Sequence, residues 1–220
     1  MNLVLIALLL VIARPLHLNA STGFLRNTAK ASFELNTFVP IETNRLVLRK
    51  IVLDDALAIF EILSDKRVVS STAGLEQYTS TDQAKELVNE IVHNYQSGYD
   101  PLIFAIIDKS SDNLIGCVGF FGYNALFSRA ELGYFLSPHS WGKGFVTEAA
   151  QALVNFGFTN MHLNRIEATV FPENSASIRV LEKIGMQCEG LMRQHVMRDG
   201  KFRDRKLYAI LRDEWQGYQR

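Results

Sequence analysis

The chain has 220 residues, 48% of them hydrophobic, which is most simply one domain with a core of ordinary size. Basic and acidic residues number 23 each, so the composition offers no bulk positive charge for nucleic acid, and direct DNA binding is not expected. The two cysteines, Cys117 and Cys188, show no CxxC spacing and no nearby histidine cluster. We interpret them as buried free thiols of a reducing, cytoplasmic compartment, with a disulfide or a metal site as the alternative.

Residues 1–40 are expected to lie apart from the domain. Leu3 to Ala13 is a run of eleven apolar residues, shorter than the roughly 20 that a membrane-spanning helix needs. It has the length of a signal-peptide core but lacks the basic residues that should precede one. Three interpretations stay open: an export signal, a membrane-associating segment, or upstream sequence from a misassigned start codon. Residues 21–40 show no periodicity and are interpreted as a linker, so the domain is expected to span residues 41–220.

The domain begins with a strand and two helices. Residues 45–49 alternate polar and apolar side chains, which predicts a short strand. Asp54 or Asp55 is suited to cap the helix that follows, and a capping box at residues 80–83 marks the start of a second, clearly amphipathic helix. Val68 to Gln77, between the two helices, is irregular; it either borders a substrate site or is plain connection.

Three strands follow, over residues 102–107, 114–121 and 130–136, each separated from the next by a polar turn. Alternation in the third strand places Glu131 and Phe135 on the same face of the sheet.

A glycine-rich turn comes directly after the third strand. The strand ends at Ser137, the chain passes through Gly142 and Gly144, and an amphipathic helix begins at once. Backbone amides in such a turn and at a helix start have no partners within the helix, and the helix dipole adds positive potential. This stretch therefore predicts an anion site suited to a diphosphate.

The last quarter of the domain reads as strand, helix and hairpin. Residues 165–170 alternate as a strand, a helix follows and is ended by Gly185, and Asp199-Gly200 between two strand-like runs is a hairpin signal. The order of elements predicts an α/β (α+β) fold, with a mixed sheet and flanking helices.

Several short motifs occur in a consistent order from about residue 41 to residue 215. They are Thr43-Asn44-Arg45-Leu46-Val47-Leu48-Arg49, Ala130-Glu131-Leu132-Gly133-Tyr134, Trp141-Gly142-Lys143-Gly144-Phe145, Asn164-Arg165-Ile166-Glu167-Ala168, Pro172-Glu173-Asn174-Ser175-Ala176-Ser177 and His195-Val196-Met197-Arg198-Asp199-Gly200. Together they resemble the GNAT N-acetyltransferases, and in particular the branch that acetylates the N-termini of ribosomal proteins. One departure is His139, which stands where the family pattern has glutamine or arginine.

The resemblance implies a sheet of about seven strands that splays open in the middle and holds acetyl-CoA in the split. It implies that pantetheine pairs with the backbone of Phe135, Leu136 and Ser137. The diphosphate would be held by amides of Trp141, Gly142, Lys143, Gly144, Phe145 and Val146.

Transfer of an acyl group to an amine requires that the amine be neutral, so a carboxylate in the split is the expected general base. Glu131 is our first choice, because it shares a strand face with Phe135, beside the implied cofactor. The alternative is a structural acid paired with an arginine or lysine.

The leaving thiolate needs a hydrogen-bond donor. Many GNAT enzymes place a tyrosine where this chain has Leu181, whereas the ribosomal branch uses a serine three residues after an asparagine. The resemblance therefore assigns the donor role to Ser177, with Asn174 as a polar anchor for the cofactor or a water. Alternatively, either residue is only the cap of the following helix.

These features predict an acetyl-CoA-dependent N-acetyltransferase that uses direct attack by the amine, without a covalent enzyme intermediate and without a metal. A protein N-terminal amine is the leading acceptor. A polyamine, an amino acid or an antibiotic amine is the alternative substrate, and a non-catalytic coenzyme A-binding module is the alternative class. The chain is expected to be a monomer or a homodimer.

Overall fold

The computed structural model describes residues 39–72, 74–97 and 101–217. The predictions for residues 1–38 lie outside the described residues. Within the described ranges, no helix has the length and apolar character needed to cross a bilayer.

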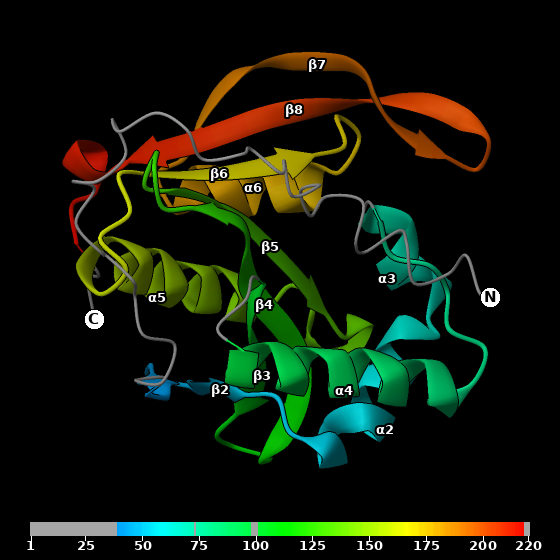
Figure 1. The fold of residues 1–220 in the computed structure, drawn as a ribbon. Coiled ribbons are helices and arrows are strands. Elements are labelled where there is room, and N and C mark those ends of the chain that lie inside the picture. The colour runs from blue at the N-terminus through cyan, green and yellow to red at the C-terminus, as the bar shows by residue number, and fades with distance from the viewer. Residues whose placement is uncertain (1–38, 73, 98–100, 218–220) are drawn as a thin grey trace, which may run out of the picture.

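One mixed sheet of eight strands runs through the molecule in the order β1-β2-β3-β4-β5-β6-β8-β7 (Figure 1). The expected mixed α/β architecture is confirmed, and the two-residue β1 brings the strand number to eight. The strands are β1 (Ile41–Glu42), β2 (Leu46–Lys50), β3 (Leu102–Asp108), β4 (Asn113–Asn124), β5 (Arg129–Leu136), β6 (Arg165–Val170), β7 (Gln187–Arg198) and β8 (Lys201–Leu211).

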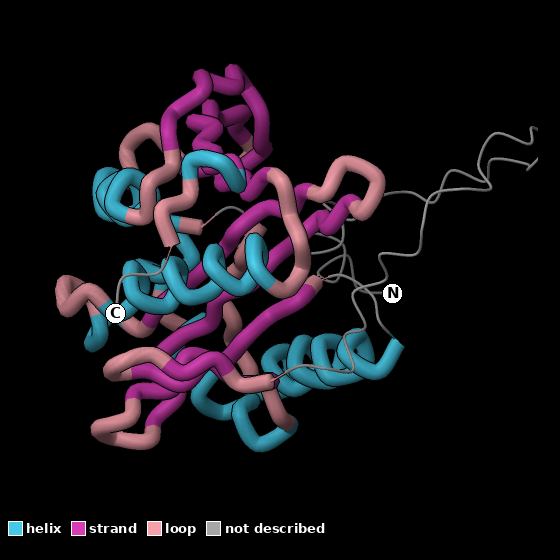
Figure 2. The backbone as a smooth tube through the Cα atoms, turned by 90° about the vertical axis from the view of Figure 1, so that its left-hand side faces the viewer, coloured by secondary structure: helices cyan, strands magenta, loops and turns pink. Residues whose placement is uncertain are grey.

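Helices cover both faces of this sheet (Figure 2). The alternating residues of β3 serve both layers, because Phe104 packs with the cluster that includes α5, whereas Ala105 packs with the cluster of α2, α3 and α4. The α-helices are α2 (Ala56–Leu63), α3 (Lys66–Ser71), α4 (Thr81–Ser97), α5 (Phe145–Thr159) and α6 (Ser175–Lys183), and the 3₁₀ helices are η3 (Leu53–Asp55), η4 (Pro138–Ser140) and η5 (Arg212–Glu214).

The sheet opens between β5 and β6. These two strands are parallel and pair only where residues 129–131 meet residues 165–167. Beyond that point β5 continues to Leu136 and β6 to Val170 without pairing to each other, while β5 stays paired to β4 and β6 to β8. The splayed sheet that the resemblance implies is therefore present, and its narrow end lies at Glu131.

Two sequence-based expectations need correction. Val68 to Gln77 is not irregular throughout, because α3 includes Val68 to Ser71 and buries Val69. Cys188 is exposed on the edge strand β7, so burial of both cysteines is wrong; both thiols are free, and Cys117 alone is buried. Burial in the core raises the pKa of the Cys117 thiol well above its ordinary value.

The predicted hairpin joins β7 and β8. Asp199 and Gly200 form its turn with φ values of 49° and 71°, the left-handed conformation that such two-residue turns require. The hairpin projects beyond the rest of the sheet (Figure 1).

Candidate active site

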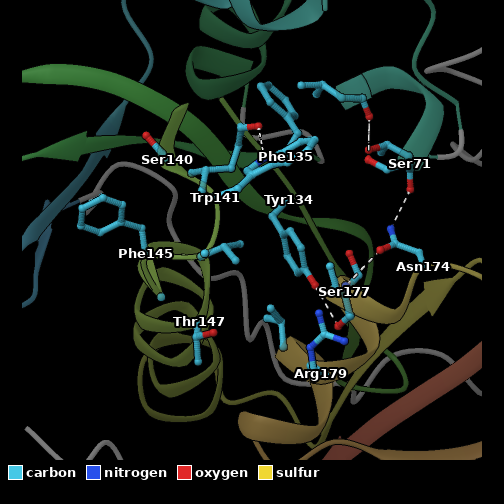
Figure 3. A pocket seen from close by; sticks show the side chains of 18 of the residues that line it. Ser71, Tyr134, Phe135, Ser140, Trp141, Phe145, Thr147, Asn174, Ser177 and Arg179 are labelled. Carbon is cyan, nitrogen blue, oxygen red and sulfur yellow. Dashed lines mark hydrogen bonds between the residues drawn. The ribbon is translucent and has the colours of Figure 1, made fainter. Parts of the chain in front are cut away.

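A cavity of about 570 Å³ opens where β5 leaves β6. Its walls come from the end of β5, the glycine turn, the start of α5, α3 and α6 (Figure 3). The cavity brings together most of the residues singled out from the sequence. Those that line it are Phe135, Leu136, Trp141, Gly142, Gly144, Phe145, Val146, Asn174 and Ser177.

The glycine turn presents unpaired amides to this cavity. Gly142 and Gly144 have φ values of 73° and 79°, a conformation that suits glycine and disfavours other residues. The first helical hydrogen bond of α5 runs from the Glu148 amide to the Gly144 carbonyl, at 3.1 Å. The amides of residues 142–147 precede it and bond to no other backbone group of the described chain, so they fit a diphosphate.

A network of hydrogen bonds and an ion pair connects this turn to the N-terminal residues of the domain. The Glu148 carboxylate accepts hydrogen bonds from the Thr43 hydroxyl at 2.7 Å and from the Arg45 side chain at 2.7 Å. Arg45 also donates to the Lys143 carbonyl at 2.9 Å. Burial alone would raise the pKa of the Glu148 carboxyl, but the bonds from Thr43 and Arg45 outweigh it and hold the pKa below its ordinary value. Thr43, Arg45 and Lys143 belong to the motifs that carry the resemblance, but the motifs alone did not indicate this network.

Two residues expected at the cofactor lie outside the cavity lining. The Ser137 amide donates to the Ile115 carbonyl at 2.8 Å, and its carbonyl accepts from the Ser140 amide at 2.9 Å. Both backbone groups of Ser137 are therefore occupied within the protein. Lys143 contributes its carbonyl to the brace from Arg45.

Asn174 and Ser177 divide the roles that the sequence left open. Asn174 caps α6, because its Oδ1 accepts a hydrogen bond from the Ser177 amide at 3.0 Å. Its Nδ2 donates to the Ser71 carbonyl in α3 at 3.1 Å. The Ser177 side chain does not serve as the cap and lines the cavity, and the Tyr134 hydroxyl donates to the Ser177 carbonyl at 3.4 Å (Figure 3).

This division makes Ser177→Ala and Asn174→Ala separable. We expect Ser177→Ala to lower turnover about 10- to 100-fold without loss of stability, since a hydrogen bond to a charged group contributes about 1.5–3 kcal/mol. Asn174→Ala should lower the free energy of unfolding by about 1 kcal/mol through loss of the cap. Steady-state kinetics and urea unfolding of both variants measure this contrast. Wild-type turnover in Ser177→Ala would remove the assigned donor role.

Glu131 lies at the narrow end of the split and is not part of the cavity lining. The Thr169 hydroxyl donates to its Oε1 at 2.7 Å. Among the ion pairs of the described residues, none includes Glu131, whereas its neighbour in register, Glu167, pairs with Arg165 at 2.6 Å. Glu131 is thus a half-buried acid whose hydrogen bond comes from a hydroxyl and not from a cation.

Further residues line the cavity, and some of them belong to the segment Val68 to Gln77, for which the border of a substrate site was one of the two interpretations. Tyr134 lines the cavity, although an aromatic residue in an apolar strand is usually core; burial raises the pKa of Tyr134 to about 12, so its hydroxyl stays protonated at neutral pH. Residues 67, 68 and 70–72 form the wall on the side of α3, and Arg179 and Lys183 extend the lining on α6. The helical period of α6 was the only sequence signal that could have placed Arg179 and Lys183 near Ser177.

Arg198 fixes α3 to the second half of the sheet. Its guanidinium donates to the carbonyls of Val69 at 2.5 Å and Thr72 at 2.8 Å, at the C-terminal end of α3. It also lies 5.5 Å from the centre of the Phe171 ring. A cation at a helix C-terminus satisfies its last carbonyls and complements its dipole. The hairpin therefore braces one wall of the cavity.

Arg198→Met should loosen this wall. We expect a loss of about 1–3 kcal/mol in the free energy of unfolding, since two partly buried carbonyls lose their donor. We also expect an increase in the acceptor KM that exceeds the decrease in kcat. Arg193→Met, an exposed position on the same hairpin, is the control and should behave as wild type. Equal kinetics in the two variants would contradict a role for Arg198 at the site.

A metal site is not apparent in the described part of the chain, where no group of three His, Cys, Asp or Glu side chains is placed to hold an ion.

Comparison with known proteins identifies the family. The model for the acetyltransferase (GNAT) domain matches residues 45–187, more than half of the chain. The uncharacterized N-acetyltransferase p20 of Bacillus licheniformis is 37% identical over 175 residues, covering 80% of this chain and 97% of that protein. The chain therefore belongs to the GNAT family of N-acetyltransferases, which use acetyl-CoA as the acyl donor.

A solved structure and two more distant relatives complete the comparison. The GNAT-family acetyltransferase of Bacillus anthracis has 33% sequence identity and a TM-score of 0.71, covering 80% of this chain and 100% of its own. Spermidine N(1)-acetyltransferase of Vibrio cholerae is 27% identical, covering 78% of this chain and 96% of its own. The ribosomal protein uS5-alanine N-acetyltransferase of Escherichia coli is also 27% identical, covering 80% and 93%.

Proposed function

We propose that the protein transfers an acetyl group from acetyl-CoA to the N-terminal amine of a protein. The observation that carries this proposal is the composition of the cavity: unpaired amides of the glycine turn and the Ser177 side chain share one space in the split. Acetyl-CoA supplies the thioester, and the phosphates of the same molecule suit those amides. The whole arrangement needs no nucleophile from the protein.

Three residues of the protein supply the proton transfer, the hydrogen bond to sulfur and the positioning. Glu131 takes a proton from the acceptor ammonium, directly or through a water, so that a neutral amine attacks. The Ser177 hydroxyl donates a hydrogen bond to the sulfur as negative charge develops on it. A new C–N bond forms and the C–S bond breaks; of the two protons that the nitrogen loses in all, one passes through Glu131 to solvent and the other balances the proton gained by the thiolate. Asn174 keeps Ser177 in place by capping α6.

The charges in the cavity favour a peptide N-terminus over a polyamine. Arg67, Arg179 and Lys183 line the cavity, and none of its described lining residues is an aspartate or a glutamate. A polyamine carries several ammonium groups that these cations would repel, whereas a peptide N-terminus carries one charge and loses it before attack. Relatives act on either class by name, so the small-molecule amine is the second candidate.

An acceptor panel with the full-length protein tests the proposal. Peptides with free N-terminal alanine or serine, the same peptides blocked at the N-terminus, and spermidine are each incubated with acetyl-CoA. We expect thiol release and α-amino acetylation, by mass spectrometry, with the free peptides alone. Acetylated spermidine with unmodified peptides would establish the small-molecule function instead. Coenzyme A binding without thiol release across the panel would favour a binding module.

A further inference from the structure

Arg205 is a buried arginine on β8 that the roles described above do not use. Only 7% of its surface is exposed. Its guanidinium stacks on the Phe171 ring, 4.9 Å from the ring centre, and its Nε is buried without a hydrogen-bond partner among the described residues. Burial lowers its pKa, the Glu131 charge raises it, and the Arg198 charge lowers it further. Burying a charged group in this way is costly, so stability alone is a weak reason for its presence.

The same guanidinium connects to Glu131 through one side chain. Arg205 Nη2 donates to the Thr169 carbonyl and, at 2.7 Å, to the Thr169 hydroxyl oxygen. That hydroxyl donates in turn to Glu131 Oε1 at 2.7 Å. The three residues lie on three neighbouring strands, β8, β6 and β5, so the connection crosses the narrow end of the split.

The direction of these hydrogen bonds follows from the donors available. An arginine can only donate, and a threonine hydroxyl has a single hydrogen. With the Arg205 N–H directed at the Thr169 oxygen, the hydroxyl hydrogen is left for Glu131. Oε1 is therefore occupied as an acceptor, and Oε2 makes no hydrogen bond to another residue of the described chain.

The neighbouring acid shows why this matters. Glu167 lies beside Glu131 in register but accepts from Arg165 and Arg129 directly, at 2.6 Å and 3.4 Å. Both contacts of Glu167 are therefore ion pairs made directly with guanidinium groups. Glu131, in contrast, is contacted by a hydroxyl that stands between it and Arg205, so its carboxylate is oriented without a direct ion pair.

We propose that Arg205 and Thr169 are positioning residues that hold the Glu131 carboxylate with Oε2 turned to the acceptor amine. This inference rests on the proposed function, because it requires Glu131 to be the base. Thr169 sets the orientation of the carboxylate, and Arg205 sets the orientation of the Thr169 hydroxyl. Neither side chain exchanges a proton with the substrate.

The test uses the full-length protein and four variants. Thr169→Val keeps the shape of the side chain and removes the hydroxyl; we expect kcat to fall about tenfold, while the acceptor KM and the coenzyme A dissociation constant change less than about twofold. Thr169→Ser restores the hydroxyl and should recover most of the activity. Arg205→Met should lower kcat similarly, and Arg203→Met, which removes an exposed arginine on the same strand, should not.

A double-mutant cycle separates this inference from the proposed function. If Thr169 acts through Glu131, then Glu131→Gln combined with Thr169→Val is no slower than Glu131→Gln alone. If Glu131→Gln is slow while Thr169→Val has wild-type turnover, or if the losses in the double variant are additive, the positioning role of Thr169 and Arg205 is wrong and Glu131 can still be the base. Wild-type turnover in Glu131→Gln would contradict both the role of Glu131 as base and the positioning role of Thr169 and Arg205. Thr169→Val keeps the test valid if Arg205→Met does not fold.

Discussion

Replacing Gly142 by valine is expected to weaken coenzyme A binding about 100-fold, or about 2.7 kcal/mol. Gly142 has a φ of 73°, which a β-branched residue adopts only under strain of about 1–3 kcal/mol. A side chain at this position meets no protein atom within 4 Å, because the position faces open space. Because Gly142 lines the cavity, we expect the valine to take up room needed by the diphosphate and to shift the amides beside it.

Gly200→Val is the matched control for this effect. Gly200 has a similar φ of 71° and equally open surroundings, but it lies in the turn between β7 and β8. Both variants carry the same backbone strain, and only Gly142→Val alters the cavity. Isothermal titration with coenzyme A compares them. Equal affinities in the two variants would show that the glycine turn does not hold the cofactor.

Glu131→Gln is expected to lower kcat by about 100-fold or more, because general base catalysis typically contributes 10²–10⁴. The amide keeps the size of the side chain and still accepts from the Thr169 hydroxyl, so the fold and the coenzyme A affinity should change little. Loss of the titrating carboxylate should also flatten the acid limb of the pH–rate profile. Initial rates across a pH series, with a coenzyme A titration at one pH, provide the measurement.

Glu167→Gln is the control that shows whether the loss of kcat is specific to Glu131 or follows from removing any acidic side chain in this part of the sheet. Glu167 stands beside Glu131 in register and is held by Arg165 and Arg129. Its loss breaks ion pairs but removes no proton acceptor near the amine, so kcat should stay within about threefold, as partly exposed ion pairs contribute at most about 1 kcal/mol. Similar losses in both variants would mean that the base lies elsewhere.

The order of strands and helices along the chain was predictable because their signals are local. Alternation identified residues 130–136 as a strand and placed Glu131 and Phe135 on one face, and the two glycines marked the start of α5. The part of the cavity lining that was predicted is likewise local, because the turn from Trp141 to Val146 is continuous in sequence.

The braces around the cavity were not predictable, because they join residues that are distant in the chain. Asn174 reaches the Ser71 carbonyl across 103 positions, and Arg198 reaches Val69 across 129. A backbone carbonyl accepts a hydrogen bond whatever the type of its residue, so the sequence could not choose between a site border and plain connection for Val68 to Gln77. The buried Arg205 was hidden for a related reason: among the charges of the hairpin, its residue type suggested solvent exposure.

The separation of β5 from β6 also has a consequence for what can enter the protein. A sheet edge is normally a hazard, because its unpaired N–H and C=O groups recruit strands from other chains and lead to aggregation. Here two such edges lie inside the molecule, and the cavity at their opening is walled by α3 and α6. The fold therefore keeps these two strand edges available to a bound ligand while the helices shield them from edge-to-edge pairing with other chains.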